Sequence, residues 1–304
     1  MNRTKTPLAL AVCAALFSLA ACGGGDPLAT DTERDADSDT IVVGSADFTE
    51  SALLAEIYAG ALEAEGVSVE KTLNIGSREA YIPALQDGSI DLIPEYTGVL
   101  AHYFDEKATA TESEAVYEEL TAALPETLAV LDMAEAEDKD AIAVTRETAD
   151  EYSLTSIADL AAVAGDLTLG AGPEWKTRSN GVPGLEKVYG AQFDSFRALD
   201  AGGPLTVQAL KNGQIDAANL FTTDPNITAN DFVVLEDPEN LFAAENVVPL
   251  ITRSKLSETI SEALNEVSAN LDTETLAALL ERVVIDKEDA GDVAADFLSE
   301  HGLA

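Results

Sequence analysis

Two segments that lie far apart in the chain have nearly the same pattern of residues. Residues 84–97 read ALQDGSIDLIPEYT, and residues 209–222 read ALKNGQIDAANLFT. Each predicts a helix that ends at an Asp-Gly or Asn-Gly pair, where glycine adopts the left-handed backbone easily, followed by a short strand. Ligands of open α/β sheets bind beyond the carboxyl ends of strands, so this repeat predicts two similar lobes that face a shared cleft. The alternative is that helix-turn-strand units reach the same pattern by propensity alone.

The first residues have the pattern of an export signal. Arg3 and Lys5 precede an apolar run that ends at Ala21 and is shorter than the roughly 20 residues needed to span a bilayer. The run closes with Leu-Ala-Ala-Cys, which resembles the lipobox of bacterial lipoproteins. We therefore expect a signal peptide over residues 1–21 and a lipid on Cys22 that anchors the protein outside the cytoplasmic membrane. An ordinary secretory signal with a chance cysteine is the alternative.

Between this anchor and the folded domain, residues 22–39 are rich in Gly, Asp and Thr and contain no aromatic residue. Such a segment cannot bury enough apolar surface to order itself, so we predict a flexible tether. Its aspartates mimic the start of a calcium loop, but the glycine and the final glutamate of such a loop are missing, and we predict no metal and no cofactor. Because Cys13 leaves with the signal and Cys22 carries the lipid, the mature chain has no disulfide.

The chain is strongly acidic, with a formal net charge of −39. Nucleic acid is excluded as a partner, because the neutralisation of phosphates needs clustered Lys and Arg. A cationic ligand would be concentrated near such a surface. Solubility in a salty or exposed environment is the simpler explanation of the charge.

Strand and helix patterns alternate along the whole domain, which predicts an α/β fold. At two places in this pattern a polar segment, here called a crossing, leads from one strand to the next. We therefore expect a middle segment that is inserted into a lobe made from both ends of the chain. The predicted limits are residues 40–140 with 237–304 for lobe 1, and 141–236 for lobe 2.

At the start of the first helix, Asp47 and Glu50 have the spacing of a capping box. The predicted strands are residues 41–44, 67–74, 90–93, 128–133, 140–144, 167–170, 232–235 and 247–251.

Motifs spread over nearly the whole mature domain resemble one family, the substrate-binding proteins of osmoprotectant ABC importers, which bind glycine betaine, choline, carnitine and related quaternary amines. The resemblance implies the two-lobed type II periplasmic-binding fold, which closes on its ligand by hinge motion. It also implies a monomer that is not an enzyme and that works with a membrane permease and its ATPase. The motifs are Gly44-Ser45 with Phe48-Thr49-Glu50, Gly76-Ser77-Arg78-Glu79, Pro94-Glu95-Tyr96-Thr97-Gly98, Gly172-Pro173-Glu174-Trp175 with Arg178, Phe221-Thr222-Thr223-Asp224, and Asn246-Val247-Val248-Pro249-Leu250.

A site for a quaternary ammonium must use aromatic faces, because this group cannot donate a hydrogen bond and each cation–π contact contributes roughly 0.5–2 kcal/mol. The resemblance places such rings at Tyr96 and Phe221, the aromatic residues at the far ends of the two repeat strands. It assigns Arg178 to a ligand carboxylate, with a surface salt bridge as the alternative. Trp175 is a further ring or a packing residue of lobe 2. Four polar residues complete the predicted site, namely Ser45, Thr97, Thr222 and Glu245.

The chain departs from the family at several aromatic positions. Ala141 stands where many relatives carry a tyrosine, and residues 242–245 read FAAE in place of a stretch that ends in tyrosine. The aromatic cage is therefore incomplete. Either Tyr81 or Tyr103 compensates, or the ligand is bulkier than glycine betaine or quite different from it.

An enzyme is the rival class of function. Its best version is a lipid-anchored hydrolase that uses two carboxylates, such as Glu50 and Glu95. The chain has no Gly-x-Ser-x-Gly, no His-Glu-x-x-His and no phosphate-binding Gly-rich motif, and it contains only two histidines. A purely structural lipoprotein is a third class, and it would need neither paired aromatic residues nor the family motifs.

Overall fold

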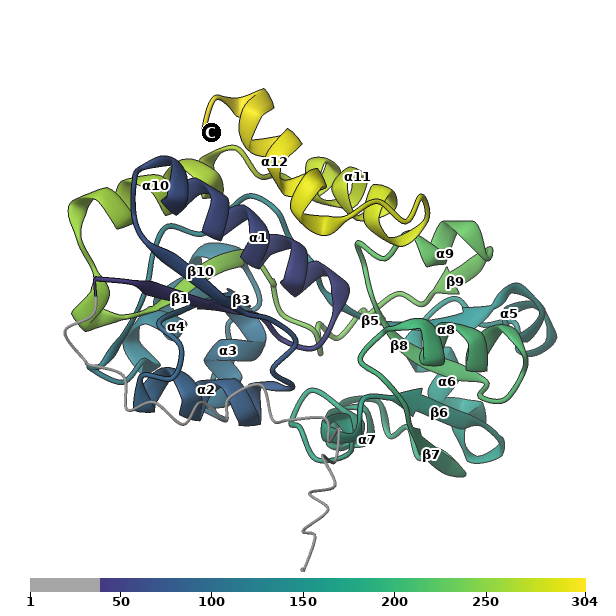
Figure 1. Ribbon diagram of the computed structural model, residues 1–304. Coiled ribbons are helices and arrows are strands. Elements are labelled where there is room, and N and C mark those ends of the chain that lie inside the picture. Colours follow the sequence, from purple (N-terminus) through teal and green to yellow (C-terminus); the bar gives the residue numbers. More distant parts are fainter. Residues whose placement is uncertain (1–38) are drawn as a thin grey trace, which may run out of the picture.

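The computed structural model describes residues 39–304. These residues form two α/β lobes, each built on a five-stranded sheet (Figure 1). The predicted signal peptide and Cys22 lie outside the described residues, as does the predicted tether except for Asp39. No helix among residues 39–304 is both long enough and apolar enough to cross a bilayer.

The first lobe takes its sheet from both ends of the domain. Its strand order is β2 (Val69–Thr72), β1 (Ile41–Gly44), β3 (Leu92–Tyr96), β10 (Val247–Thr252) and β4 (Leu128–Val130). The strand β1 runs parallel to both β2 and β3, whereas β10 runs antiparallel to β3 and β4. The central strand of this sheet is thus β3, the strand of the first repeat segment.

The second lobe repeats this arrangement with strands from the middle of the chain. Its order is β7 (Ser195–Ala198), β6 (Thr168–Ala171), β8 (Ala217–Phe221), β5 (Asp140–Thr145) and β9 (Phe232–Val234). The strand β6 is parallel to β7 and β8, and β5 is antiparallel to β8 and β9. The strand of the second repeat segment, β8, therefore occupies the same central place as β3.

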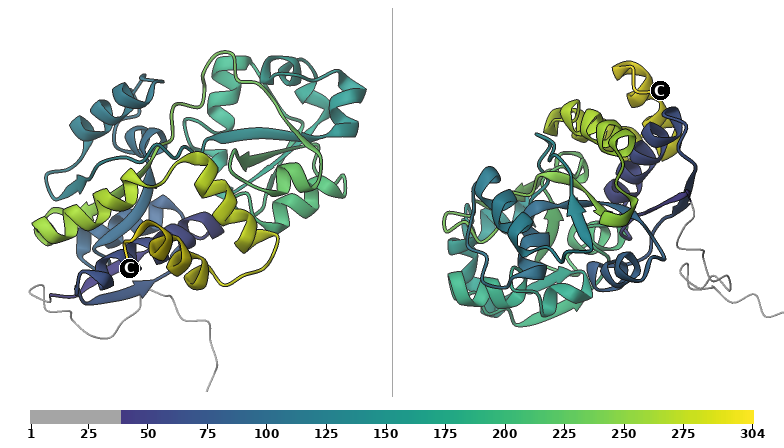
Figure 2. Two further views of the ribbon diagram at one scale, coloured as in Figure 1. Left: turned by 90° about the horizontal axis from the view of Figure 1, so that it is seen from above. Right: turned by 90° about the vertical axis from the view of Figure 1, so that its left-hand side faces the viewer.

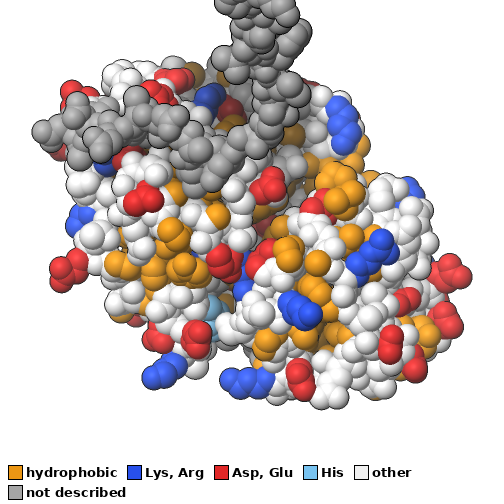
Figure 3. All heavy atoms as spheres, turned by 60° about the horizontal axis from the view of Figure 1, so that its bottom comes forward, with side chains coloured by type: hydrophobic (Ala, Val, Ile, Leu, Met, Phe, Trp, Pro, Cys, Tyr) orange, Lys and Arg blue, Asp and Glu red, His pale blue; other side chains and the backbone are white. Residues whose placement is uncertain are grey.

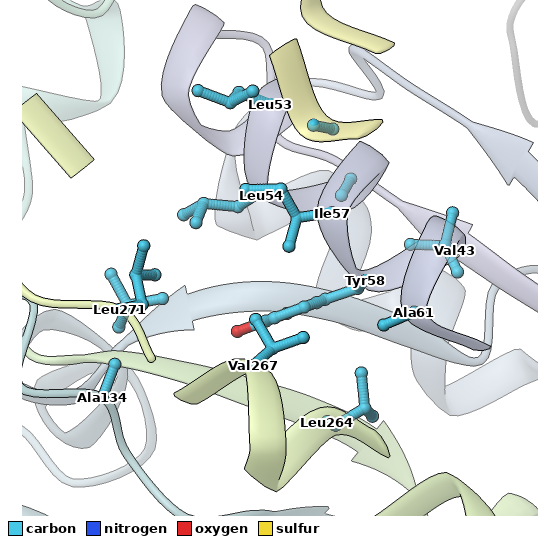
Figure 4. Packing of buried hydrophobic residues seen from close by; sticks show 14 of the residues in the cluster. Val43, Leu53, Leu54, Ile57, Tyr58, Ala61, Ala134, Leu264, Val267 and Leu271 are labelled. Atoms are coloured by element: carbon cyan, nitrogen blue, oxygen red, sulfur yellow. The ribbon is translucent and has the colours of Figure 1, made fainter. Parts of the chain in front are cut away.

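Helices cover the sheets, and the C-terminal helices lie alongside α1 on the first lobe (Figures 1 and 2). Tyr58 extends from α1 over Val267 of α10, in a core that also buries Leu53, Leu54 and Ile57 completely (Figure 4). The helices are α1 (Thr49–Ala64), α2 (Arg78–Asp87), α3 (Thr97–Phe104), α4 (Ser113–Ala123), α5 (Arg146–Tyr152), α6 (Ile157–Val163), α7 (Val182–Tyr189), α8 (Pro204–Lys211), α9 (Asn226–Ala229), α10 (Glu258–Ala269), α11 (Thr273–Val284) and α12 (Ala290–His301).

The predicted geometry of the repeat is confirmed in both lobes. Gly88 has φ of +80° and Gly213 has φ of +63°, so each helix is followed by the left-handed residue that the sequence predicts. Tyr96 is the last residue of β3, and Phe221 is the last residue of β8.

The aspartate of the repeat also has the same role in each lobe. One carboxylate oxygen of Asp91 accepts a hydrogen bond from the Val42 N–H at 2.9 Å, and one of Asp216 accepts from the Thr168 N–H at 2.8 Å. Each bond ties the central strand to its parallel neighbour. The Ile-Asp of the repeat thus has a structural explanation that needs no ligand.

The α/β class and the two-lobed fold are confirmed, and each predicted strand overlaps an observed one. The strand β7 and the helices α10 to α12 were not among the predicted elements. The chain passes from one sheet to the other between β4 and β5 and again between β9 and β10, where Glu137 and Asn246 form an antiparallel bridge. These passages lie close to the predicted lobe limits at 140/141 and 236/237, which stay a prediction.

The predicted capping box at the start of α1 is wrong. The residue that precedes the helix is Phe48, and no side chain caps the helix there. The carboxyl group of Glu50 turns away from the helix end, because it accepts hydrogen bonds from Tyr96 and Thr223, which come from distant parts of the chain.

Candidate ligand-binding site

A cavity of about 580 Å³ lies between the lobes and takes its lining from both. The last residues of β3 and β8 line it, as the repeat predicts. Its aromatic side chains are Phe48, Tyr81, Tyr96, Trp175 and Phe221, and its charged side chains are Asp47, Arg78, Asp138, Asp140, Glu174, Arg178, Asp200 and Glu245.

Three aromatic rings form a continuous wall of this cavity. The ring of Phe48 stacks on that of Phe221 with centroids 5.3 Å apart, and it lies 6.1 Å from the ring of Tyr96 at an angle of 33°. Phe48 comes from the first lobe and Phe221 ends a strand of the second, so the stack joins the two lobes. Phe48 belongs to one of the family motifs in the sequence but was not among the predicted site residues.

A buried pair of carboxyl groups stands beside this wall. Glu50 accepts hydrogen bonds from the Tyr96 hydroxyl and the Thr223 hydroxyl, each at 2.6 Å, and Asp138 accepts from the Thr223 N–H at 3.0 Å. Each residue is only 4% exposed. Burial raises the pKa of Glu50 despite these hydrogen bonds, and burial together with the nearby charge of Glu50 raises the pKa of Asp138 well above its usual range.

The buried carboxylate of Glu95 lies behind the cavity lining and is held by Arg78 and Tyr81, which line the cavity. The Arg78 guanidinium donates to both oxygens of Glu95, at 2.8 and 2.7 Å, and the Tyr81 hydroxyl donates to Glu95 at 2.8 Å. Glu95 is completely buried. Glu50 and Glu95 are therefore each held by their own donors, and the hydrolase that the sequence left as an alternative finds no support here.

Two further buried carboxylates face the cavity. Asp140 accepts hydrogen bonds from the side-chain amides of Asn180 and Asn219, both at 2.8 Å. Glu245 accepts from the backbone N–H groups of Gly98 and Val99, at 2.9 and 3.0 Å, so it caps the start of α3 across the second crossing. Burial raises the pKa of both carboxyl groups, and that of Glu245 rises well above its usual range.

Arg178 lines the cavity and also bridges the lobes. Its guanidinium donates to the two oxygens of Glu79 on α2, at 3.0 and 3.2 Å. Partial burial would raise the pKa of Glu79, but the hydrogen bonds from Arg178 and Ser77 outweigh it and bring the pKa to about 2. The salt bridge that the sequence analysis named as the alternative for Arg178 is thus present in this structure.

Of the eight predicted ligand-binding residues, the structure brings five to the cavity, namely Tyr96, Trp175, Arg178, Phe221 and Glu245. Trp175 is 2% exposed and packs 6.0 Å from the ring of Phe242, so it belongs to the core of the second lobe as well. Contact of these five residues with a ligand stays a prediction.

The other three predicted residues do not line the cavity. The Ser45 hydroxyl bonds to nearby backbone at Ala46 and Asn74. The Thr97 hydroxyl accepts from the Asn246 N–H, and the exposed Thr222 accepts from the backbone of lobe 1 near the first crossing. All three hydroxyls accept hydrogen bonds from backbone N–H groups, and the Thr222 hydroxyl also donates to Asp138, which lines the cavity.

Several lining residues were missed by sequence reasoning. Tyr81, which was named as one replacement for the missing cage, lines the cavity, whereas Tyr103 does not. The carboxylates Asp138 and Asp140 and the amide of Asn219 were not named as site residues. The two aspartates lie at the first crossing. Their position between the lobes is the one feature of the sequence that could have identified them as site residues.

Comparisons with known proteins identify the family. A sequence profile described as the substrate binding domain of ABC-type glycine betaine transport system matches residues 39–300. The chain is 31% identical over 276 residues to the glycine betaine-binding protein YehZ of Escherichia coli, covering 86% of this chain and 90% of that protein. It is 30% identical over 319 aligned positions to a glycine-betaine-binding protein of Pseudomonas aeruginosa, covering 100% of this chain and 96% of that protein.

A solved structure titled as a glycine betaine/carnitine/choline ABC transporter has the same fold, with a TM-score of 0.67 at 23% identity over 86% of this chain and 99% of that one. This likeness bears on the fold alone. The profile match and the two relatives, in contrast, cover most of the chain. The chain therefore belongs to the family of substrate-binding domains of ABC-type glycine betaine transport systems, which are transport proteins and not a class of enzyme.

Proposed function

We propose that this protein captures a quaternary-amine osmolyte, such as glycine betaine, choline or carnitine, and delivers it to an ABC importer. One observation carries the proposal. The rings of Phe48, Tyr96 and Phe221 and the buried carboxyl group of Asp138 meet at one cavity between two lobes. Relatives named for the binding of glycine betaine and carnitine support the same class of ligand.

The chemistry of the wall suits such a ligand. A methylated ammonium has no N–H to donate, so it is held by ring faces and by negative charge, and each ring contributes roughly 0.5–2 kcal/mol. Micromolar binding needs about −8 kcal/mol in total, so several rings must act together. A carboxylate on the ligand would have to share Arg178 with Glu79, whereas choline, which is an alcohol, needs no arginine partner.

The proposal includes the location of the protein and its attachment to the membrane. The lipid on Cys22 would hold the protein outside the cytoplasmic membrane as a monomer, with residues 22–39 as the tether that lets the lobes reach a membrane permease and its ATPase. Capture would proceed by closure of the lobes about the crossings near Asp138 and Asn246, because two short connections allow rotation with little repacking.

Titration calorimetry tests the proposal. The purified protein should bind at least one of choline, glycine betaine and carnitine saturably, with one ligand per chain. Phe48→Ala should lose roughly 0.5–2 kcal/mol, about two- to thirty-fold in affinity, because one ring face disappears. Phe48 is a cleaner probe than Tyr96, whose hydroxyl also holds Glu50.

Tyr103→Ala is the matched control, because this ring is 38% exposed and does not line the cavity. It should bind like the parent. Failure of the parent to bind any of the three compounds would reject the proposed function. Equal affinity of Phe48→Ala and the parent would show that the ring wall is not the site.

A further inference from the structure

We propose that Glu50 and Asp138 form the anionic counter-charge of the ligand's ammonium group, and that binding of this group expels a proton from the pair. The inference rests on the proposed function and extends it, because it names the residues that oppose the cationic charge and the ion that is exchanged for it. The two carboxyl groups share Thr223, whose hydroxyl donates to Glu50 and whose N–H donates to Asp138, and Asp138 lines the cavity next to the ring wall.

The pair is held by neutral donors from both lobes. Tyr96 and the Thr223 hydroxyl donate to Glu50, and the Thr223 N–H and the Thr222 hydroxyl donate to Asp138. These bonds hold three carboxyl oxygens, both of Glu50 and one of Asp138, without adding any positive charge. The geometry is therefore prepared for a negative charge that the protein itself does not balance.

The basic side chains around the cleft are committed elsewhere. Among residues 39–304, no Lys or Arg forms an ion pair with Glu50 or Asp138. Lys139 pairs with Glu137 at 3.1 Å, and the ammonium of Lys287 donates to a backbone carbonyl of α11. Arg78 and Arg178 are paired with Glu95 and Glu79. On the face shown in Figure 3, blue basic side chains likewise occur singly among red acidic ones.

The other titratable groups near the pair are also acidic. Asp47 precedes α1, Glu95 and the Tyr96 hydroxyl come from β3, Asp200 precedes α8, and Asp224 follows β8. Each of these carboxylates adds negative potential around the pair. A ligand cation in the first cavity would place a positive charge directly against Asp138, with which no Lys or Arg of residues 39–304 forms an ion pair.

Physical chemistry then links the cation to a proton. A buried charge without a counter-charge is unfavourable, so in the empty site the pair retains a proton, in line with the raised pKa of both groups. An ammonium beside Asp138 stabilises the ionised pair and lowers its pKa. One carboxylic acid then becomes a carboxylate, and its proton passes to the buffer.

The leaving proton also has a route to water. A second cavity of about 530 Å³ lies against Glu50, Asp138 and Thr223, and the stacked rings of Phe48 and Phe221 line both cavities. Asp138 thus lines both cavities, whereas Glu50 lines the second one only. In this proposal the proton leaves through the second cavity.

The sign of the pH dependence follows. Between the pKa of the pair in the liganded protein and its higher pKa in the empty protein, binding releases a proton, so the affinity rises with pH. If one proton is released per ligand, the affinity rises about tenfold per pH unit in that window. At a pH above both values, no proton is released and the affinity becomes constant.

Calorimetry of choline binding in buffers of different ionisation enthalpy, repeated over a series of pH values, counts the protons released at each pH. We expect a release that approaches one proton per choline within this series, and an affinity that increases with pH until the release ends. Glycine betaine replaces choline as the probe if choline does not bind. The parent protein alone gives this result, so the test does not depend on the folding of any variant.

Two variants locate the proton. The double variant Glu50→Gln with Asp138→Asn removes both carboxyl groups while conserving their shape, so it should bring the release close to zero. Glu79→Gln, which removes a carboxylate on the rim, should release as many protons as the parent. Binding of choline or glycine betaine with no dependence on the buffer would overturn this inference and leave the proposed function intact. Absence of binding of choline, glycine betaine and carnitine would instead reject the proposed function itself, and this inference with it.

Discussion

Arg78, which lines the cavity, forms a buried ion pair with Glu95. Of the contacts described at the cavity, this is the one whose loss we expect to destabilise the protein most. The side chain of Glu95 is 0% exposed and that of Arg78 is 7% exposed. Glu95 accepts four hydrogen bonds, two from Arg78, one from the Tyr81 hydroxyl and one from the Tyr96 N–H. The substitution Glu95→Gln keeps the shape of the side chain but removes the charge.

The expected loss follows from the burial of the partner. Without Glu95, the guanidinium of Arg78 remains in the interior with no bound counter-charge, and breaking a buried pair in this way costs about 3–5 kcal/mol. For a domain of this size, each kcal/mol corresponds to about 2–4 °C, so the melting temperature should fall by about 6–20 °C.

Denaturant unfolding and scanning calorimetry of Glu95→Gln measure this loss. Glu79→Gln is the matched control, because Glu79 is 49% exposed in its pair with Arg178 and exposed pairs contribute about 0–1 kcal/mol. The double variant Glu95→Leu with Arg78→Met should recover most of the lost stability, since no charge is left buried. If Glu95→Gln is no less stable than the control, the argument from buried charge is refuted.

Two further predictions concern the contacts between the crossings and the lobes. Gly98→Ala would place a methyl group 2.6 Å from a carboxylate oxygen of Glu245, so it should lower the free energy of unfolding by about 1–3 kcal/mol. Gly165→Ala is the control, because its added methyl group would have its nearest atom at 4.0 Å, and it should melt like the parent. Equal melting temperatures of the two variants would contradict this prediction. Arg178→Gln removes the bridge to Glu79, so the empty protein should have a larger radius of gyration at low salt, and the difference should fade at high salt. Scattering curves that match the parent at low salt would show that this bridge does not hold the lobes together.

The sequence predicted the features that depend on neighbours in the chain. The helix ends at Gly88 and Gly213 and the aromatic ends of β3 and β8 arise within single helix-turn-strand units, so residue order is enough to predict them. Because both units also sit at the centre of equivalent sheets, a pattern of fourteen residues predicted where the two lobes would face each other.

The partners of charged groups could not be predicted in the same way. Glu50 looked like a capping residue from its spacing, yet its donors Tyr96 and Thr223 lie 46 and 173 residues away. The bond between Arg78 and Glu95 links α2 to β3, and nothing in the order of residues distinguishes Glu95 from the other acidic residues of the chain. Such pairs depend on how the elements pack, which local patterns do not encode.

The difference between the predicted rings and the predicted hydroxyls has a physical cause. A ring at the end of a strand reaches beyond the neighbouring backbone groups, so Tyr96 and Phe221 extend into the space between the lobes. A hydroxyl is short and bonds to the nearest free backbone group, as Thr97 does with Asn246 and as Thr222 does with Lys139. Both of these bonds tie a strand end to one of the two crossings. The threonines of the repeat thus hold the connections about which the lobes would turn, and the rings beside them are left free to face a ligand.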